Sequence, residues 1–410
     1  MLYDKTDKNS IYEYARGLKG QSFNNICDND FVFLDEHADR EGYKDEFRNN
    51  RRKGGLGELV EERYFHYEAD NESRADFPEA ELELKVTPYK KNKNGTLSAK
   101  ERLSISMINY HDIVTTPFYD SNAWEKIKNI LLVYYEWHPD CEDRLDYIID
   151  YIYLYSPSAE DLPIIINDYE TIQKKVKLGL AHELSEGDTL YLGAATKSSS
   201  ANDRTTQPYS TELAKPRVYS LKNSYMTHLL RNTIVPYHEA QDKVVPSGEV
   251  VYDLEAYIVN KINQYKGKKT EDLYTQLIKK GKYGTSKSRY SQLAYAMLGI
   301  TTARAEEFEK ANIEVKAIRL SLLKSGHHTM KESISFPKFK IKDLVEEEWE
   351  TSTIRQQFID KKYLFVIYKE VTTGVFVLDE AKFWNMSLDD IDGALKEEWL
   401  RARNIFREGV

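Results

Sequence analysis

The sequence contains one pattern twice, and this repeat constrains the fold more than any other feature. ADFPEAELELK at residues 75–85 matches EEFEKANIEVK at 306–316 without a gap, so that Glu83 corresponds to Glu314. In this same register, which we call the repeat register, KERLSISMINYHDIV (100–114) matches KESISFPKFKIKDLV (331–345). A third pair, KNILLVYYE and KKYLFVIYKE, follows with a shift of about two residues. Three matches in one order predict two tandem copies of one domain.

The chain length agrees with two domains, because 410 residues exceed what one hydrophobic core usually organises. The Pro, Ser and Gly in PYHEAQDKVVPSGE suit a connection between them. We therefore predict a first domain at 1–235, a linker at 236–249 and a second domain at 250–410. The basic end of the first copy has no counterpart in the second, so we expect the second to be incomplete at its C-terminal side by about fifty residues.

Each copy is expected to be mixed α/β. Apolar residues at three- and four-residue spacings predict a helix over 57–67. ELELKVTP predicts a strand ended by Pro88, and RLSISMI a second strand that forms a hairpin with it. WEKIKNILLVYYEW predicts a helical turn followed by a buried central strand.

The strand predicted at 81–88 also carries residue types that are used in catalytic sites. Residues two apart on a strand share a face, so Glu83 and Lys85 project together, and Asp76 on the preceding loop can approach them. Two carboxylates suit Mg²⁺, and a nearby ammonium can orient water or stabilise charge. The same pattern is also that of a plain amphipathic strand, and alone it does not distinguish the two. Upstream, Glu61 can lie beside the inward face of the predicted helix, or in solvent.

Composition excludes several classes. Two cysteines cannot form a disulfide framework, and no Cys/His spacing suggests zinc. No apolar run is long enough for a membrane, so we expect a cytoplasmic protein with no membrane partner. A net charge of −9 argues against unselective nucleic-acid binding. Residues 191–231 are locally basic, however, and form either a DNA-binding surface or a solvated face.

Several of these segments together resemble a known family. KGGLGELVE (53–61), DFPEAELELKVTP (76–88) and YSLKNSYMT (219–227) are similar to the MutH family of GATC-specific endonucleases. The likeness is greatest to the Sau-type II restriction enzymes, which carry a second, degenerate MutH-like domain, and it extends over essentially the whole chain. It implies a restriction-endonuclease-like core of the PD-(D/E)xK class and Mg²⁺-dependent double-strand cleavage of DNA at GATC. It also implies a regulatory second domain, with a second DNA site as effector and a DNA-induced dimer as further expectations.

Matching positions carry over the family's functional residues. The catalytic set that the resemblance implies is Asp76, Glu83, Lys85, Glu61 and Lys53, of which Asp76, Glu83 and Glu61 would hold the metal. The DNA-binding set is Lys126, Lys197, Arg204, Arg217, Tyr219 and Lys222. The resemblance also places Lys126 near a position that the family uses close to the active site. Arginine and lysine side chains that reach guanine N7 and O6 would provide the physical basis for reading GATC.

The sequence departs from the family pattern in two places, and each bears on the expected activity. Ser220 stands where the mismatch-repair branch has a tyrosine associated with sensing adenine methylation, which favours restriction over repair. In the second copy Glu307, Glu314 and Lys316 replace the Asp-Glu-Lys signature, while Gln292 and Gly284 stand for Glu61 and Lys53. A neutral amide cannot serve as a charged metal partner, so we predict an inactive second copy. The alternatives are a MutH-like methylation-directed nicking endonuclease and a non-catalytic DNA-binding relative.

Overall fold

The computed structural model of the chain describes residues 2–31, 40–48, 55–67, 74–198, 200, 202–235, 241–278, 288–336 and 338–409. Contacts divide it into two compact units. The first comprises Met1–Ser158 and Arg217–His238, and the second comprises Ala159–Pro216 and Glu239–Val410. Predicted Lys53 lies outside the described residues.

The first unit begins with helices and continues with strands. Its helices are α1 (Lys8–Ala15), α2 (Phe23–Phe31), α3 (Arg40–Arg48), α4 (Gly55–Leu59), α5 (Tyr110–Ile113), α6 (Asn122–Ile127) and α8 (Asn223–Leu229). Its strands are β1 (Glu83–Lys91), β2 (Leu97–Ala99), β3 (Leu103–Met107), β4 (Ile130–Glu136), β5 (Ile149–Tyr155) and β7 (Arg217–Leu221). Helix α4 continues as a π-helical turn, Val60–Tyr64, so the helix predicted over 57–67 is present.

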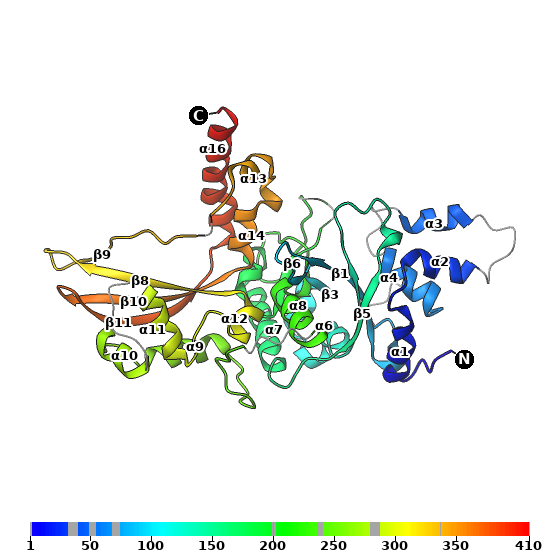
Figure 1. The fold of residues 1–410 in the computed structure, drawn as a ribbon, viewed down its shortest axis with the longest axis horizontal. Coiled ribbons are helices and arrows are strands. Elements are labelled where there is room, and N and C mark those ends of the chain that lie inside the picture. The colour runs from blue at the N-terminus through cyan, green and yellow to red at the C-terminus, as the bar shows by residue number, and fades with distance from the viewer. Residues whose placement is uncertain are drawn as a thin grey trace. The chain divides into compact units, whose positions relative to one another are not determined.

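A four-stranded sheet of order β2-β1-β4-β5 forms the centre of this unit. Strand β1 pairs parallel with β4, and β5 pairs antiparallel with β4 on the other side. Figure 1 shows α1 to α4 together on one side of this sheet. Their apolar residues join Leu84, Leu131 and Val133 of the strands in one core. Because β4 is covered on both faces, its first five residues are all buried, as a continuous apolar run predicts.

Two details of the predicted strands were wrong. Strand β1 passes through Pro88 to Lys91, because the Pro88 carbonyl still accepts from Lys100 N and only the missing N–H is lost from the ladder. The hairpin partner of β1 is β2, not the strand predicted from RLSISMI. That strand is β3, which pairs with β7 instead. A tight turn around Gly95, at φ 83°, makes the shorter hairpin.

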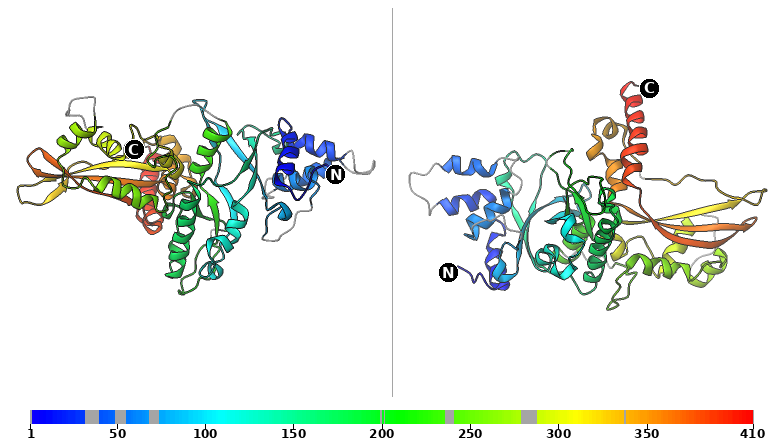
Figure 2. Two further views of the ribbon diagram at one scale, coloured as in Figure 1. Left: turned by 90° about the horizontal axis from the view of Figure 1, so that it is seen from below. Right: turned by 180° about the vertical axis from the view of Figure 1, so that it is seen from behind.

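The second unit has longer strands. Its helices are α7 (Leu162–Lys177), α9 (Leu254–Asn263), α10 (Thr270–Leu277), α11 (Ser288–Leu298), α12 (Glu306–Ala311), α13 (Ile341–Glu346), α14 (Thr353–Asp360), α15 (Leu388–Asp390) and α16 (Lys396–Arg407). Its strands are β6 (Leu192–Thr196), β8 (Ile313–Leu322), β9 (His328–Met330), β10 (Lys362–Thr372) and β11 (Val375–Trp384). Figure 2 shows β8, β10 and β11 as a twisted sheet with α9, α10 and α11 along one face.

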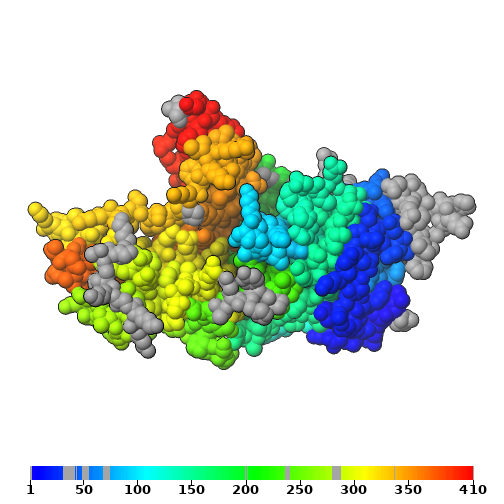
Figure 3. Space-filling view, viewed as in Figure 1, coloured from blue at the N-terminus to red at the C-terminus, as the bar shows by residue number. Residues whose placement is uncertain are grey.

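The sheet of the second unit has the order β9-β8-β10-β11, the same order and directions as β2-β1-β4-β5. Helices α13 and α16 lie side by side near its other end, as the space-filling view also shows (Figure 3). A second apolar cluster, which includes Trp349, Phe358 and Trp399, joins these helices to Tyr363 of β10.

Local backbone features recur in the repeat register. Tyr89 pairs with Ala99, and the corresponding residues Leu320 and Met330 pair in the second sheet. Glu81 and Asn312, which also correspond, both adopt left-handed backbone, at φ 49° and φ 53°. For residues with a Cβ this conformation is uncommon, so its recurrence at corresponding positions is specific.

Helix caps recur in the same way. The Ser121 hydroxyl accepts from Trp124 N before α6, and the Ser352 hydroxyl accepts from Arg355 N before α14. Each hydroxyl also donates to a carbonyl three residues back. The two serines correspond in the repeat register. The two segments therefore share turn and cap chemistry as well as strand order.

The predicted linker is buried at Val244 and Val245 and exposed over residues 246–249. Val244 is buried, and its N–H donates to Glu307 at 2.9 Å. Residues 236–240 lie outside the described ranges. The domain limits predicted above come from the sequence repeat, whereas the two units come from contacts. The predicted limits therefore remain a prediction. In the part of the chain that the structure describes, no helix has the length and apolar character needed to cross a membrane.

Asp168 on α7 holds the start of β6 in place. Its buried carboxylate accepts from the N–H groups of Leu190, Tyr191 and Leu192 at 2.7, 2.6 and 2.8 Å. These three donors would otherwise be buried without a partner, which is costly. The carboxylate therefore fixes the chain just before the basic residues that begin at Lys197.

Replacing Asp168 by Ala is expected to lower the free energy of unfolding by about 3–5 kcal/mol, because three buried N–H groups lose a charged acceptor. Urea unfolding measures the loss. Asp253→Ala is the control, since it removes an exposed helix cap on α9 and should cost only about 1 kcal/mol. Equal losses in the two variants would contradict the role given to Asp168.

Candidate active site

A tight turn brings Asp76 back over the first residues of β1. The chain passes through a 3-10 turn at Pro78–Ala80, and left-handed Glu81 then redirects it into the strand. Phe77 and Leu82 bridge the turn through two backbone hydrogen bonds of 2.9 and 3.1 Å. As a result Asp76 Oδ2 accepts from Leu84 N at 2.8 Å. The loop aspartate and the strand glutamate are thus brought together, as the sequence predicts.

Glu83 is the buried centre of the site. Its side chain has no exposed surface, and its Oε1 contacts Lys85 Nζ at 2.5 Å and Lys126 Nζ at 3.2 Å. Its Oε2 is buried and has no hydrogen-bond partner among the described residues. A buried carboxylate oxygen without a partner is costly unless a ligand satisfies it. One oxygen is therefore held by cations of the chain, and the other is available to a metal ion.

Burial and neighbouring charges set the protonation of the other two members. Burial, together with repulsion from Glu83, raises the pKa of Asp76 above its ordinary value, although Lys85 and Lys126 oppose this. Burial lowers the pKa of Lys85, but attraction to Glu83 and Asp76 outweighs it and the pKa of Lys85 is raised. Lys85 is therefore a persistent ammonium, suited to hold a water molecule or stabilise negative charge rather than to act as a base.

Glu61 lies at the same site from a different element. It belongs to the π-helical turn after α4, and its charge also raises the pKa of Lys85. Helix α4 contacts β1 and contributes buried Leu56 and Leu59 to the core, which anchors the turn. The helix carboxylate and the strand signature therefore converge on one lysine.

The fit to a metal ion can be tested on these groups. As the side chains stand, no three acidic, His or Cys groups in the described ranges form a complete metal-binding cluster. The donor set nonetheless consists of hard carboxylate oxygens, and the buried Oε2 of Glu83 is without a partner. Mg²⁺ keeps several water ligands and needs only one or two carboxylates, so these residues fit it.

The predicted DNA-binding residues fall into three groups. Lys126, at the end of α6, contacts Glu83 and so lies at the active site, near which the resemblance places it. Lys197 and Arg204 are exposed or partly exposed. The remaining three are buried, each at most 5% exposed: Arg217, Tyr219 and Lys222. Arg217 hydrogen-bonds Tyr110, and burial raises the pKa of Tyr110 to about 12 despite that contact.

The second sheet keeps part of this arrangement. Glu314 contacts Lys316 and Lys361, each at 2.6 Å, much as Glu83 contacts two lysines. Lys126, however, corresponds to Gln357 in the repeat register, and Gln357 donates to Tyr363 Oη instead.

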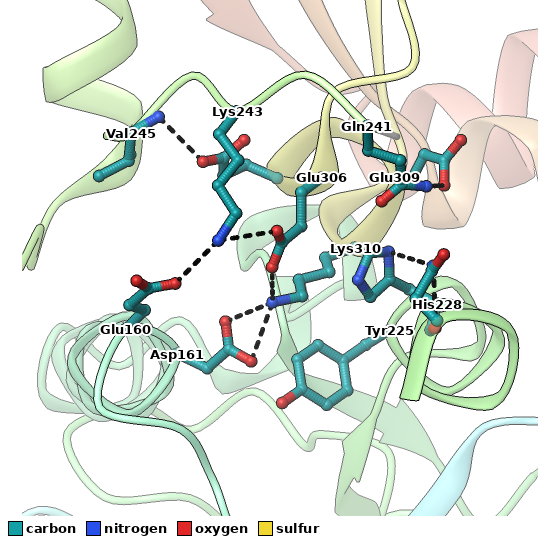
Figure 4. Close-up of polar contacts among 12 residues, drawn as sticks. Glu160, Asp161, Tyr225, His228, Gln241, Lys243, Val245, Glu306, Glu309 and Lys310 are labelled. Carbon is teal, nitrogen blue, oxygen red and sulfur yellow. Dashed lines mark hydrogen bonds and ion pairs between the residues drawn. The ribbon is translucent and has the colours of Figure 1, made fainter. Parts of the chain in front are cut away.

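The aspartate position is also changed in the second sheet. The two oxygens of Glu307 accept from Val244 N and Val245 N at 2.9 Å each, so they are used as a backbone cap. Figure 4 shows this segment, where Lys243 bridges Glu160 and Glu306. Glu307 thus takes a structural role in place of the one Asp76 has beside β1.

Two comparisons find known proteins that are similar to this chain. The family model described as DNA mismatch repair enzyme MutH matches residues 65–168, which include Asp76, Glu83, Lys85 and Lys126. The type II restriction enzyme Sau3AI of Staphylococcus aureus is 34% identical over 374 residues, which cover 87% of this chain and 75% of that protein.

Asp76→Asn is expected to increase the free energy of unfolding at pH 8 in the presence of EDTA. Because the folded state raises the pKa of Asp76, ionising it costs stability at high pH, and that cost disappears as pH falls below the unfolded value of 3.8. The amide oxygen of Asn can still accept from Leu84 N. Urea unfolding at pH 8, where the cost is present, and at pH 3, where it is absent, measures the difference in stability. Asp140→Asn, at an exposed site, is the control. A loss of stability at pH 8 would contradict the assignment.

Proposed function

On the premise that the chain belongs to the family of the type II restriction enzyme Sau3AI, and is therefore a type II restriction endonuclease, we propose how its site works. We propose that it is a PD-(D/E)xK nuclease that cuts both strands of DNA at GATC, with Mg²⁺ as the metal. The observation that carries the proposal is the buried Glu83, which has one oxygen between two lysines and the other without a partner among the described residues. Its role as a restriction enzyme also fits the cytoplasmic location expected from the sequence.

We propose that Asp76, Glu83 and Glu61 hold the metal, with Lys53 at the edge of the same motif. When bound, the ion would polarise the scissile phosphate and lower the pKa of a water molecule. Lys85 would orient that water for attack on phosphorus and stabilise the charge that develops as the P–O bond breaks. Lys126 would keep the Glu83 side chain in position, because it contacts the same oxygen as Lys85.

For recognition, we propose DNA contacts by Lys197 and Arg204, which are not buried. Their cationic side chains suit phosphates and the guanine acceptors of GATC. We assign Arg217, Tyr219 and Lys222 a supporting role in β7 and the start of α8, because their side chains are buried.

We further propose that the chain contains two copies of one domain, the first catalytic and the second regulatory. The shared sheet order, the matched left-handed residues and the matched caps support this proposal. In the second copy Gln292 and Gln357 replace charged groups and Glu307 caps the backbone, which supports loss of catalysis. A cleft of about 590 Å³ beside β8, lined by Lys316, Arg319 and Lys331 among others, is where we propose that a second DNA site binds as effector.

Double-strand cleavage by such a chain has a consequence for assembly. With one intact signature per chain, cutting both strands requires two chains or two successive nicks. We propose a dimer formed on DNA, in which each chain cuts one strand, because a two-fold assembly matches the two-fold symmetry of GATC. Sedimentation with and without a GATC duplex distinguishes the two cases.

Lys85→Ala should reduce plasmid cleavage by about 100-fold or more while DNA binding is retained, because it removes transition-state stabilisation and not the DNA surface. The assay compares Mg²⁺ with EDTA and reads the fragment pattern for GATC. Lys128→Ala is the control, since Lys128 pairs with exposed Glu81, outside the site. Full activity of Lys85→Ala, or equal loss in both variants, would refute the proposed site.

A methylation-directed nicking enzyme is the second candidate, because the matched family model describes a mismatch repair enzyme. Ser220, buried in β7, disfavours it, since the repair branch has tyrosine there. We expect unmethylated GATC duplexes to be cut on both strands. A product nicked in one strand only, and only on hemimethylated duplex, would favour the repair reading.

A further inference from the structure

The loop at residues 206–213 is held by several hydrogen bonds although much of it is exposed. Thr205 and Ala214 close its base through backbone hydrogen bonds of 2.8 and 2.9 Å. Inside it, buried Gln207 accepts from Ala181 N at 2.7 Å and donates to the Glu212 carbonyl at 2.6 Å. The loop is therefore fixed both across its own base and to the turn after α7.

Tyr209 is displayed at the outer part of this loop at an energetic cost. Its side chain is 74% exposed, and in the described residues its ring makes no hydrogen bond or ring contact. Its backbone is left-handed, at φ 63°. This conformation is unfavourable for a residue with a Cβ, and with 74% exposure Tyr209 buries little surface in return.

Gly179 shows that the surroundings accommodate this conformation. Its own φ is 74°, and a Cβ added there would lie 2.6 Å from the Tyr209 carbonyl oxygen. That is a clash with backbone, which cannot rotate away as a side chain could. Glycine at position 179 therefore permits the close approach of this segment to the Tyr209 carbonyl.

This loop follows the proposed DNA contacts directly along the chain. Arg204 directly precedes its closing bridge, and Lys197 precedes it on the same stretch of chain. An exposed aromatic ring on a rigid support beside cationic side chains is the combination that packs against nucleic-acid bases and sugars. Leu213, 52% exposed in the same loop, adds a second apolar side chain.

We propose that Tyr209 is a DNA-contacting residue whose ring packs against the sugars and base edges of the duplex. The inference rests on the proposed function, because it takes the basic stretch from Lys197 as the DNA surface. It adds a neutral, apolar contact to the ionic ones of Lys197 and Arg204. A neutral contact differs from an ionic one in a measurable way, since it releases no counterion.

The experiment uses the full chain in a Lys85→Ala background with Mg²⁺, and measures binding to a labelled GATC duplex across salt concentrations. Tyr209→Ala should weaken binding about tenfold at every salt concentration, without changing the slope against salt. Arg204→Ala should reduce that slope by about one. Tyr209→Phe keeps the ring and should bind as the parent does. Val250→Ala, at another apolar site with 65% exposure, is the matched control.

Tyr209→Asn separates a DNA contact from a structural role. Asn tolerates left-handed backbone, so the melting temperature should equal or exceed that of the parent while affinity falls as in Tyr209→Ala. Binding within twofold of the parent in both variants would overturn the inference, and so would a parallel loss of melting temperature and affinity. If the parent shows no preference for GATC over a scrambled duplex, the proposed specificity fails, while the effect of Tyr209 on duplex affinity still tests the inference.

Discussion

The buried carboxylate of Glu83 is the constraint on which the first unit depends. An ionised group without exposed surface is tolerated only when opposite charges and hydrogen bonds surround it. Lys85 comes from the same strand, but Lys126 reaches Glu83 only because α6 ends just before β4 and β4 pairs parallel with β1. The helical core behind Leu84 and Val133 holds that pairing in place. Fold and chemistry therefore share the same few contacts.

The spacing of apolar residues along the chain predicted the features that depend on the periods of a strand and a helix. Alternation placed Glu83 and Lys85 on one face, and helical spacing placed Glu61 on a helix that contacts the strand. The Lys126 contact was not predicted, because it depends on the β1–β4 register between segments far apart in the sequence. The pairing of β3 with β7 instead of β1 was missed for the same reason. So was the continuation of β1 through Pro88, which pairs with Tyr135 of β4. Pairing partners are a tertiary property.

The two sheets show which features of such a domain are most constrained. Strand order, the left-handed residue before the first strand and the serine cap before the helix recur in both. Among the side chains to which we assign catalysis, Glu83 and Lys85 recur as Glu314 and Lys316. Lys126 and Glu61 do not recur, since Gln357 and Gln292 stand at their positions. Backbone geometry stabilises the fold at every position, whereas a charged site costs stability unless it is used. For the two copies of one domain that we propose, this difference explains how the backbone pattern is retained while the catalytic site is lost.

The charge balance around Glu83 also bears on the order in which ligands arrive. Asp76, Glu83 and Glu61 carry three formal negative charges, and Lys85 and Lys126 carry two positive ones. These five described side chains by themselves therefore carry one net negative formal charge, which opposes the approach of a phosphodiester. The divalent cation that we propose would make the net formal charge of this group positive, which favours the approach of a phosphate. Under the proposed mechanism, the metal ion would therefore control the approach of the scissile phosphate as well as its cleavage.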